Sequence, residues 1–73
     1  MTRPTFAKQL RKTRIKADIS QSELARMTGI DRTAINRYES GRCTPEIGNL
    51  VLIADALDVS ADVLLGRRRK ANW

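Results

Sequence analysis

The sequence predicts an all-α fold of five short helices. Apolar residues recur at spacings of three and four, residues that cap helices precede these runs, and glycines follow several of them. A chain of 73 residues forms one domain, which buries only about 60% of the surface that the unfolded chain exposes. We therefore expect a compact helical domain with little room for a deep catalytic pocket.

The first helix is expected from Thr5 to Lys16. Phe6 and Leu10 lie one turn apart and face inward, and Arg14 comes next in the same row. An arginine in an inward row is unusual, because charged side chains are rarely buried without a partner.

Two short helices joined by a tight turn are predicted in the middle of the chain. Ser20 and Glu23 form a capping box at the start of the first of them, and Asp31 caps the second. Gly29 and Gly41 can take the left-handed conformation that ends each helix. This pattern over residues 20–42 is that of a helix-turn-helix.

Helical spacing separates the two faces of this pair. The inward residues are Leu24, Ala25 and Thr28 in the first helix, Ile30 in the turn, and Ile35 and Tyr38 in the second helix. The outward residues of the second helix are Arg32, Thr33, Asn36 and Arg37. Arginine matches the acceptor pair of guanine and asparagine can bridge adenine, so this face suits the major groove of duplex DNA. A merely solvated polar face is the alternative.

The last two helices complete the predicted core. Thr44 is expected to cap a fourth helix with Pro45 at its first position, where a missing N–H costs nothing. Its inward stripe is predicted to be Ile47, Leu50, Val51, Ala54 and Leu57. Ser60 is expected to cap a fifth helix, Ala61 to Leu65, which Gly66 ends.

The charge changes sign along the chain. Residues 1–42 hold ten Lys or Arg and four acids, residues 43–66 hold four acids and no base, and the run from Arg67 to Lys70 adds four bases. A basic first half can face phosphates while the acidic half turns away from them. An ordinary solvated surface is again the alternative.

Composition argues against an enzyme. The chain has no histidine, which removes imidazole as a base or a metal ligand. Asp55, Asp58 and Asp62 fit helix ends better than a metal site, so we expect no metal and no cofactor. Cys43 is the single cysteine and cannot form an internal disulfide. No run reaches the roughly 20 apolar residues of a membrane span, and the start lacks a secretory signal. We expect a cytoplasmic protein with no membrane partner.

Several of these residues also occur together in a known family. They are Arg14, Ser20 with Gln21, Leu24, Ala25, Gly29, Ile35, Glu39 to Gly41, and Pro45. Over about residues 6 to 65 the chain resembles the helix-turn-helix family of the phage lambda and 434 repressors and Cro, which includes the XRE-like bacterial regulators. It departs from the family at Thr13, where leucine is common, and at Asp18, where glycine is common. Asp18 can still adopt a left-handed backbone at some cost.

The resemblance implies a compact five-helix, lambda-repressor-like DNA-binding domain, to which we assign residues 1–66. Because Gly66 ends the last predicted helix and the residues beyond it are few and charged, residues 67–73 are expected to form a short basic tail. The resemblance places Arg32, Thr33, Asn36 and Arg37 at the DNA groove, although Thr33 or Asn36 could contact the backbone instead. It assigns phosphate contacts to Gln21 at a helix N-terminus, and to Arg42 and Arg11 or Arg3. It also implies a largely buried ion pair between Arg14 and Glu39; the alternative is that both are exposed and unrelated.

The expected function is sequence-specific binding of double-stranded DNA as a transcriptional repressor or controller. The family pairs two domains on a pseudo-palindromic operator, so we expect a homodimer. Apolar surface for the contact is offered by Leu57, Val59, Val63 and Leu65, some of which must complete the monomer core. Two alternatives stay open: an antitoxin-type module whose main partner is an unknown protein, and non-specific binding of RNA or an anionic membrane through the basic tail.

Overall fold

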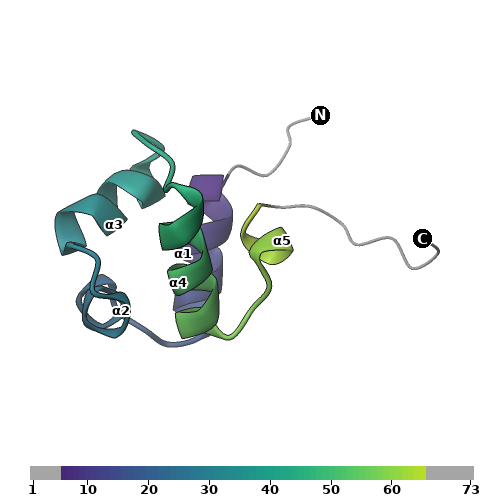
Figure 1. Ribbon diagram of the computed structural model, residues 1–73. Coiled ribbons are helices and arrows are strands. Elements are labelled where there is room, and N and C mark those ends of the chain that lie inside the picture. The colour runs from purple at the N-terminus through teal and green to yellow at the C-terminus, as the bar shows by residue number, and fades with distance from the viewer. Residues whose placement is uncertain (1–5, 66–73) are drawn as a thin grey trace.

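Five helices and no strand make up residues 6–65, the part of the chain that the computed structural model describes (Figure 1). The helices are α1 (Phe6–Lys16), α2 (Gln21–Thr28), α3 (Arg32–Ser40), α4 (Ile47–Leu57) and α5 (Ala61–Leu64). The predicted all-α class and the order of the five elements are confirmed.

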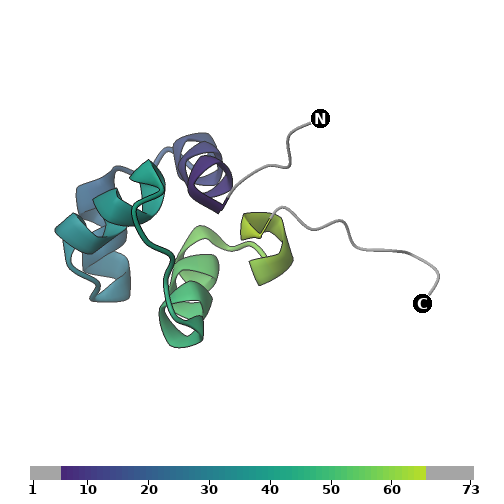
Figure 2. The same ribbon diagram turned by 90° about the horizontal axis from the view of Figure 1, so that it is seen from above.

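The helices pack so that α2 and α3 occupy one side of the domain. The α1 helix packs against α3 and α5, α2 packs against α3 and α4, and α4 packs against α5. Figures 1 and 2 both show α2 and α3 at one side and α5 at the opposite side. One face of α3 therefore rests on the other helices and the other face is left open.

Local interactions fix the ends of α2 and α3 as predicted. The Ser20 hydroxyl accepts a hydrogen bond from the Glu23 N–H, and the Glu23 carboxylate accepts one from the Ser20 N–H, both at 3.0 Å. The bond from the Ser20 backbone lowers the pKa of Glu23, because it stabilises the charged carboxylate. The Asp31 carboxylate accepts from the Thr33 N–H at 3.5 Å. Gly29 and Gly41 have φ angles of +75° and +81°.

Thr28 fixes the turn between α2 and α3. Its hydroxyl donates to the Leu24 carbonyl at 2.8 Å and accepts from the Ile30 N–H at 3.2 Å. Ile30 itself is buried in the core. The Thr28 hydrogen bonds and the buried Ile30 side chain thus fix the turn, and with it the direction of α3 relative to α2.

All five helices contribute to a single core. Its buried members are Leu10, Leu24, Ile30, Ile35, Tyr38, Ile53, Ala54, Leu57 and Leu64. The Tyr38 hydroxyl accepts a hydrogen bond from the Asn49 amide at 3.2 Å, which ties α3 to α4. Thus α3 is anchored to α4 by a polar contact as well as by its buried side chains.

The predicted start of the fourth helix is wrong by two residues. The N-cap of α4 is Glu46, which makes no side-chain capping bond, so Thr44 is not the cap and Pro45 is not the first helical residue. The φ angle of proline suits an extended connection as well as a first helical turn, and here the chain uses Pro45 in the connection. Ser60 is the N-cap of α5, again without a side-chain bond, and α5 ends at Leu64 rather than Leu65.

The predicted inward stripe of α4 is also partly wrong. Ile47 and Val51 are 79% and 47% exposed, whereas Ile53, absent from the prediction, is fully buried. The inward residues are Leu50, Ile53, Ala54 and Leu57. Because α4 carries apolar side chains on several faces, two stripes with the same spacing compete, and only packing against α2 and α5 selects one.

Two aspartates have left-handed backbones. Asp18, in the connection between α1 and α2, has a φ of +60°, as the sequence allowed. Asp58, which ends α4, has a φ of +57°. Aspartate tolerates this region better than most residues, because its short side chain can bond locally.

Candidate nucleic-acid interface

The outer face of α3 carries the four residues predicted to read bases. Arg32, Thr33, Asn36 and Arg37 are all exposed, and their spacing of one, three and four residues puts them on one face of the helix. Arg32, Thr33 and Asn36 line a shallow hollow of about 270 Å³. The face therefore presents guanidinium, hydroxyl and amide groups together, which can bond to the edges of base pairs.

An ion pair ties the C-terminal turn of α3 to α1. The Arg14 guanidinium donates to the two carboxylate oxygens of Glu39, from Nε at 2.5 Å and from Nη2 at 3.0 Å. Its third contact is from Nη1 to the Ile19 carbonyl at 2.8 Å. The two charged side chains are 13% and 5% exposed. The structure thus brings together the two residues that the resemblance paired.

The pair has the expected effect on ionisation. The hydrogen bond to Glu39 raises the pKa of Arg14 above its usual value; burial opposes this shift, and the attraction of the Glu39 charge adds to it. Because arginine already titrates far above neutrality, the guanidinium stays charged at every pH at which the protein is handled. The bond between α1 and α3 is therefore insensitive to pH on the arginine side.

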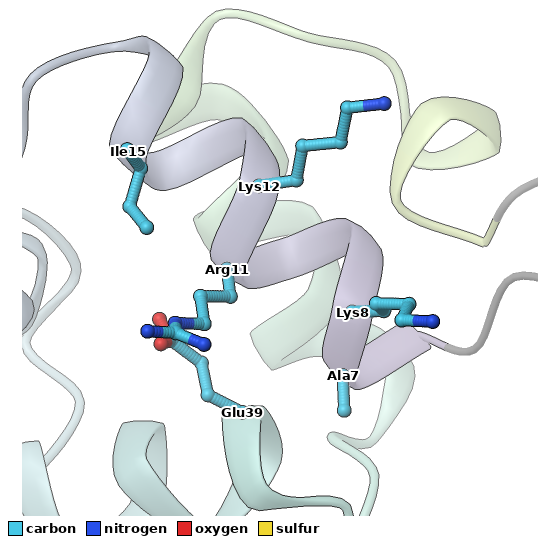
Figure 3. A pocket seen from close by; sticks show the side chains of 6 residues that line it. All are labelled: Ala7, Lys8, Arg11, Lys12, Ile15 and Glu39. Carbon is cyan, nitrogen blue, oxygen red and sulfur yellow. The ribbon is translucent and has the colours of Figure 1, made fainter.

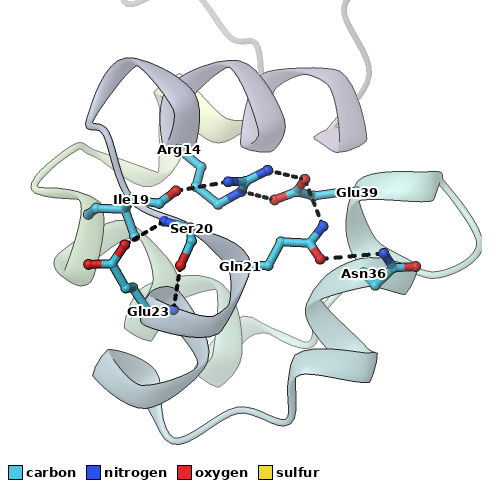
Figure 4. Close-up of polar contacts among 7 residues, drawn as sticks. All are labelled: Arg14, Ile19, Ser20, Gln21, Glu23, Asn36 and Glu39. Carbon is cyan, nitrogen blue, oxygen red and sulfur yellow. Dashed lines mark hydrogen bonds and ion pairs between the residues drawn. The ribbon is translucent and has the colours of Figure 1, made fainter.

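Gln21 joins this ion pair to the outer face of α3. Its Nε2 donates to Glu39 Oε1 at 3.2 Å, and its Oε1 accepts from Asn36 Nδ2 at 3.4 Å (Figure 4). Sequence spacing gave no sign of these contacts, because they join residues that are 15 and 18 positions apart on different helices. The backbone N–H of Gln21 still lies in the first turn of α2, where anions are favoured.

Basic side chains gather on α1 next to the end of α3. A hollow of about 390 Å³ is lined by Ala7, Lys8, Arg11, Lys12, Ile15 and Glu39. Figure 3 shows Arg11 extending from α1 toward the Glu39 carboxylate. Arg42 is exposed in the connection that follows α3. Of the predicted phosphate contacts, Arg3 lies outside the described residues.

The four residues predicted to form a dimer contact divide into two groups. Leu57 is buried in the core and Val59 packs against it, so both complete the monomer. Val63 and Leu65 are 43% and 40% exposed. Of these four residues, Val63 and Leu65 are therefore the two that offer substantial apolar surface. The predicted tail, residues 67–73, lies outside the described residues.

Within residues 6–65 no helix is long and apolar enough to cross a membrane. Among the same residues, no three or more Cys, Asp or Glu side chains lie together as a group that could hold a metal ion.

Sequence relatives include a phage repressor and a bacterial transcription factor. The chain is 48% identical over 48 residues to the cryptic phage CTXphi transcriptional repressor RstR of Vibrio cholerae, an alignment that covers 66% of this chain and 43% of the repressor. It is 38% identical over 63 residues to a hypothetical transcription factor of Neisseria meningitidis, covering 86% of this chain and 59% of that protein. The chain thus spans about half the length of these relatives.

Solved structures show the same fold. The P22 c2 repressor, crystallised with synthetic operator 9T, superimposes with a TM-score of 0.79 at 33% identity, covering 84% of this chain and 92% of the repressor chain. The restriction-modification controller protein C.AhdI from Aeromonas hydrophila gives a TM-score of 0.78 at 32% identity, covering 81% and 89% of the two chains.

The family model described as Helix-turn-helix (HTH_3) matches residues 10–64, which include α2, α3 and the Arg14–Glu39 pair. The geometry of the two helices and the match of sequence over most of the domain agree. The chain belongs to the helix-turn-helix family of the phage repressors and XRE-type regulators.

Proposed function

We propose that this chain is a sequence-specific DNA-binding transcriptional regulator, acting as a repressor or controller at a promoter. The observation that carries the proposal is the outer face of α3, where four polar side chains stand exposed on a helix that Glu39 and Tyr38 tie to α1, α2 and α4. A rigid helix holds its side chains in a fixed register, which base recognition requires.

The proposed division of roles follows the positions of the side chains. Arg32 stands at the N-terminal end of α3, the end that enters deepest in helix-turn-helix proteins. With Thr33, Asn36 and Arg37 it would contact base edges. The backbone at Gln21, and the side chains of Arg11 and Arg42, would contact phosphates and position the domain on the duplex.

The relatives support regulation as the purpose of this binding. RstR is named as a transcriptional repressor, C.AhdI as a restriction-modification controller, and the P22 c2 repressor was solved on a synthetic operator. These functions are those of the relatives, and extending them to this chain is part of the proposal. Since this chain spans about half the length of its sequence relatives, the regulatory role of the whole protein is part of the proposal.

A homodimer on a pseudo-palindromic operator is the form of binding that we propose. One short helix reads only a few base pairs, so two domains about one helical turn apart supply the specificity that one lacks. Val63 and Leu65 are the candidates for the contact, and α5 lies on the side of the domain opposite α2 and α3. A contact there would leave the outer face of α3 free for DNA.

Selection from random duplexes tests the proposal. We expect the protein to enrich one recurring sequence with two-fold symmetry, and to bind it more tightly than unrelated duplexes or RNA at moderate salt. Tighter binding is expected because specific sites typically exceed non-specific DNA by about 10³-fold or more. Equal binding to the enriched sequence, random duplex and RNA would contradict the proposal and favour non-specific attraction to polyanions.

A further inference from the structure

A directed chain of hydrogen bonds runs from the part-buried Arg14–Glu39 pair to the outer face of α3. Glu39 Oε1 accepts from Arg14 Nη2 at 3.0 Å and from Gln21 Nε2 at 3.2 Å. Gln21 Oε1 then accepts from Asn36 Nδ2 at 3.4 Å. Figure 4 shows the four side chains in this order, with the Asn36 amide nitrogen toward Gln21 and its oxygen on the far side.

The charge of Glu39 sets the direction of the whole chain. A side-chain amide has a donor end and an acceptor end of nearly the same shape, so a free amide can present either. The carboxylate of Glu39, paired with Arg14, only accepts hydrogen bonds. Gln21 must therefore turn its Nε2 toward Glu39, which leaves its Oε1 facing Asn36.

The same rule then applies to Asn36. The Gln21 oxygen only accepts, so Asn36 must turn its Nδ2 inward; the reversed amide would set two oxygens against each other. What Asn36 presents outward is its Oδ1 acceptor and the second N–H of its Nδ2. The exposed side chain of Asn36 thus has one preferred orientation instead of two.

We infer that Gln21 is a positioning residue that sets which base Asn36 reads. This inference rests on the function proposed above. In the major groove adenine alone presents an N–H donor beside an acceptor on one base, at N6 and N7, and an outward Oδ1 beside an N–H matches that pair. Because the amide is held before binding, less freedom is lost when it meets the base. Asn36 therefore selects adenine at one position of each half-site.

This role differs from a phosphate contact by the Gln21 side chain. A phosphate contact has no preference among bases, so its loss weakens binding to every duplex by a similar factor. Loss of a positioning residue changes the preference at one base pair and leaves the others as they were. The two roles can therefore be separated by measuring preference position by position.

The test replaces Gln21 with methionine, which has a similar length and cannot make the two amide bonds. The DNA is the duplex selected by the unaltered protein, together with all its single-base substitutions. We expect Gln21→Met to lower the preference for adenine at one position per half-site by about 2- to 10-fold. Asn36→Ala should lower it at the same position by about 5-fold or more. In the double variant, Gln21→Met should add nothing to the effect of Asn36→Ala.

Ser22→Ala is the matched control, since it alters an exposed side chain one residue along the same first turn of α2. It should leave all base preferences unchanged. A second measurement uses the free protein: in NMR spectra the side-chain amide protons of Asn36 should change position and exchange faster with water in Gln21→Met. This signal reports the bond itself, whatever the effect on DNA.

Three results would overturn the inference. If Gln21→Met weakens all duplexes equally, Gln21 acts only through phosphate. If Asn36→Ala changes the preference at no position, or changes it where adenine is not selected, Asn36 does not read adenine. An unaltered protein that enriches no common sequence would overturn the proposed function itself, and the positioning role with it.

Discussion

At the scale of single residues, Arg14 and Glu39 illustrate how an ion pair is held in a part-buried position of a small domain. The Arg14 guanidinium donates three hydrogen bonds, two to the charged carboxylate of Glu39 and one to the Ile19 carbonyl. A buried ion pair adds little compared with apolar residues of the same shape, yet breaking it leaves one charge without a partner. The pair therefore specifies how α1 and α3 are joined more than it raises stability.

The first prediction follows from that asymmetry. Arg14→Met and Glu39→Gln should each lower the free energy of unfolding by about 3 to 5 kcal/mol, a large share of the roughly 5 to 15 kcal/mol that is typical of folded proteins. The double variant should lose much less than the sum, because neither charge is then left alone. Urea denaturation measures all three. Single variants within about 1 kcal/mol of the parent would show that the pair behaves as an exposed one.

A second prediction concerns the arginines on the outer face of α3. Arg32→Ala or Arg37→Ala should cost about 1 to 3 kcal/mol of binding free energy on the selected duplex and less on random DNA, since a bidentate contact to guanine is lost only where guanine is present. Neither side chain contributes to the core, so folding should be unaffected. Equal losses of binding free energy on the selected duplex and on random DNA would show that α3 does not recognise the base sequence.

At the scale of elements, the capping box of α2 makes helix formation depend on pH. The bond from Ser20 holds the pKa of Glu23 below its usual value. A carboxylate with a lowered pKa in the folded state contributes stability above its unfolded pKa of about 4.3. That contribution is lost as the pH falls through the lower, folded value.

The third prediction is therefore that Glu23→Gln destabilises the domain near pH 6 and makes less and less difference as the solution is acidified below about pH 4. Urea denaturation at a series of pH values measures this. Ser20→Ala removes only the hydroxyl contact and keeps the backbone N–H that donates to Glu23, so in its background Glu23→Gln should keep a weaker dependence on pH. A difference that stays constant from neutral to acid pH would mean that the Glu23 carboxylate is not held by the cap.

The elements also show what can be predicted from the sequence. The ends of α2 and α3 were predictable, because Ser20, Asp31, Gly29 and Gly41 act on the backbone within a few residues. The outward face of α3 was predictable for the same reason, since helical spacing fixes it. The contact of Gln21 with Asn36 and the inward stripe of α4 were not, because both depend on how separate helices pack.

A fourth prediction uses the two isoleucines on which that stripe depends. Ile53→Ala should cost about 2 to 5 kcal/mol of unfolding free energy, because it leaves a cavity in the core. Ile47→Ala removes the same atoms from a side chain that is 79% exposed, so it should change stability by no more than about 0.5 kcal/mol. Urea denaturation of the two variants shows which face of α4 packs against the core. Equal costs would mean that Ile47 is buried by something in solution.

At the scale of the whole molecule, the basic side chains of α1 and the acidic side chains near the C-terminal end of the described fold belong to different elements. The basic residues of α1 line the hollow beside the end of α3, whereas Asp55, Asp58 and Asp62 belong to the end of α4 and to α5. DNA phosphates attract the basic residues of the first group and repel the acidic residues of the second. The acidic region is therefore expected to face away from the DNA, where it is free to meet a second protein. Val63 and Leu65 lie in this second, acidic region.

The last prediction tests whether that region joins two protomers. Val63→Glu or Leu65→Glu places a charge in the proposed contact between protomers, which should weaken that contact. The core should survive either change, because Val63 and Leu65 are part-exposed and the fully buried residue of α5 is Leu64. We expect cooperative binding to a full operator to weaken more than folding does. Leu52→Glu is the matched control, because Leu52 is 45% exposed on α4, outside the proposed contact, and it should keep cooperative binding. Sedimentation of the unaltered protein at saturating concentration should find two protomers on one operator; a single protomer there would refute the dimer, and the specificity would then have to come from one copy of α3 alone.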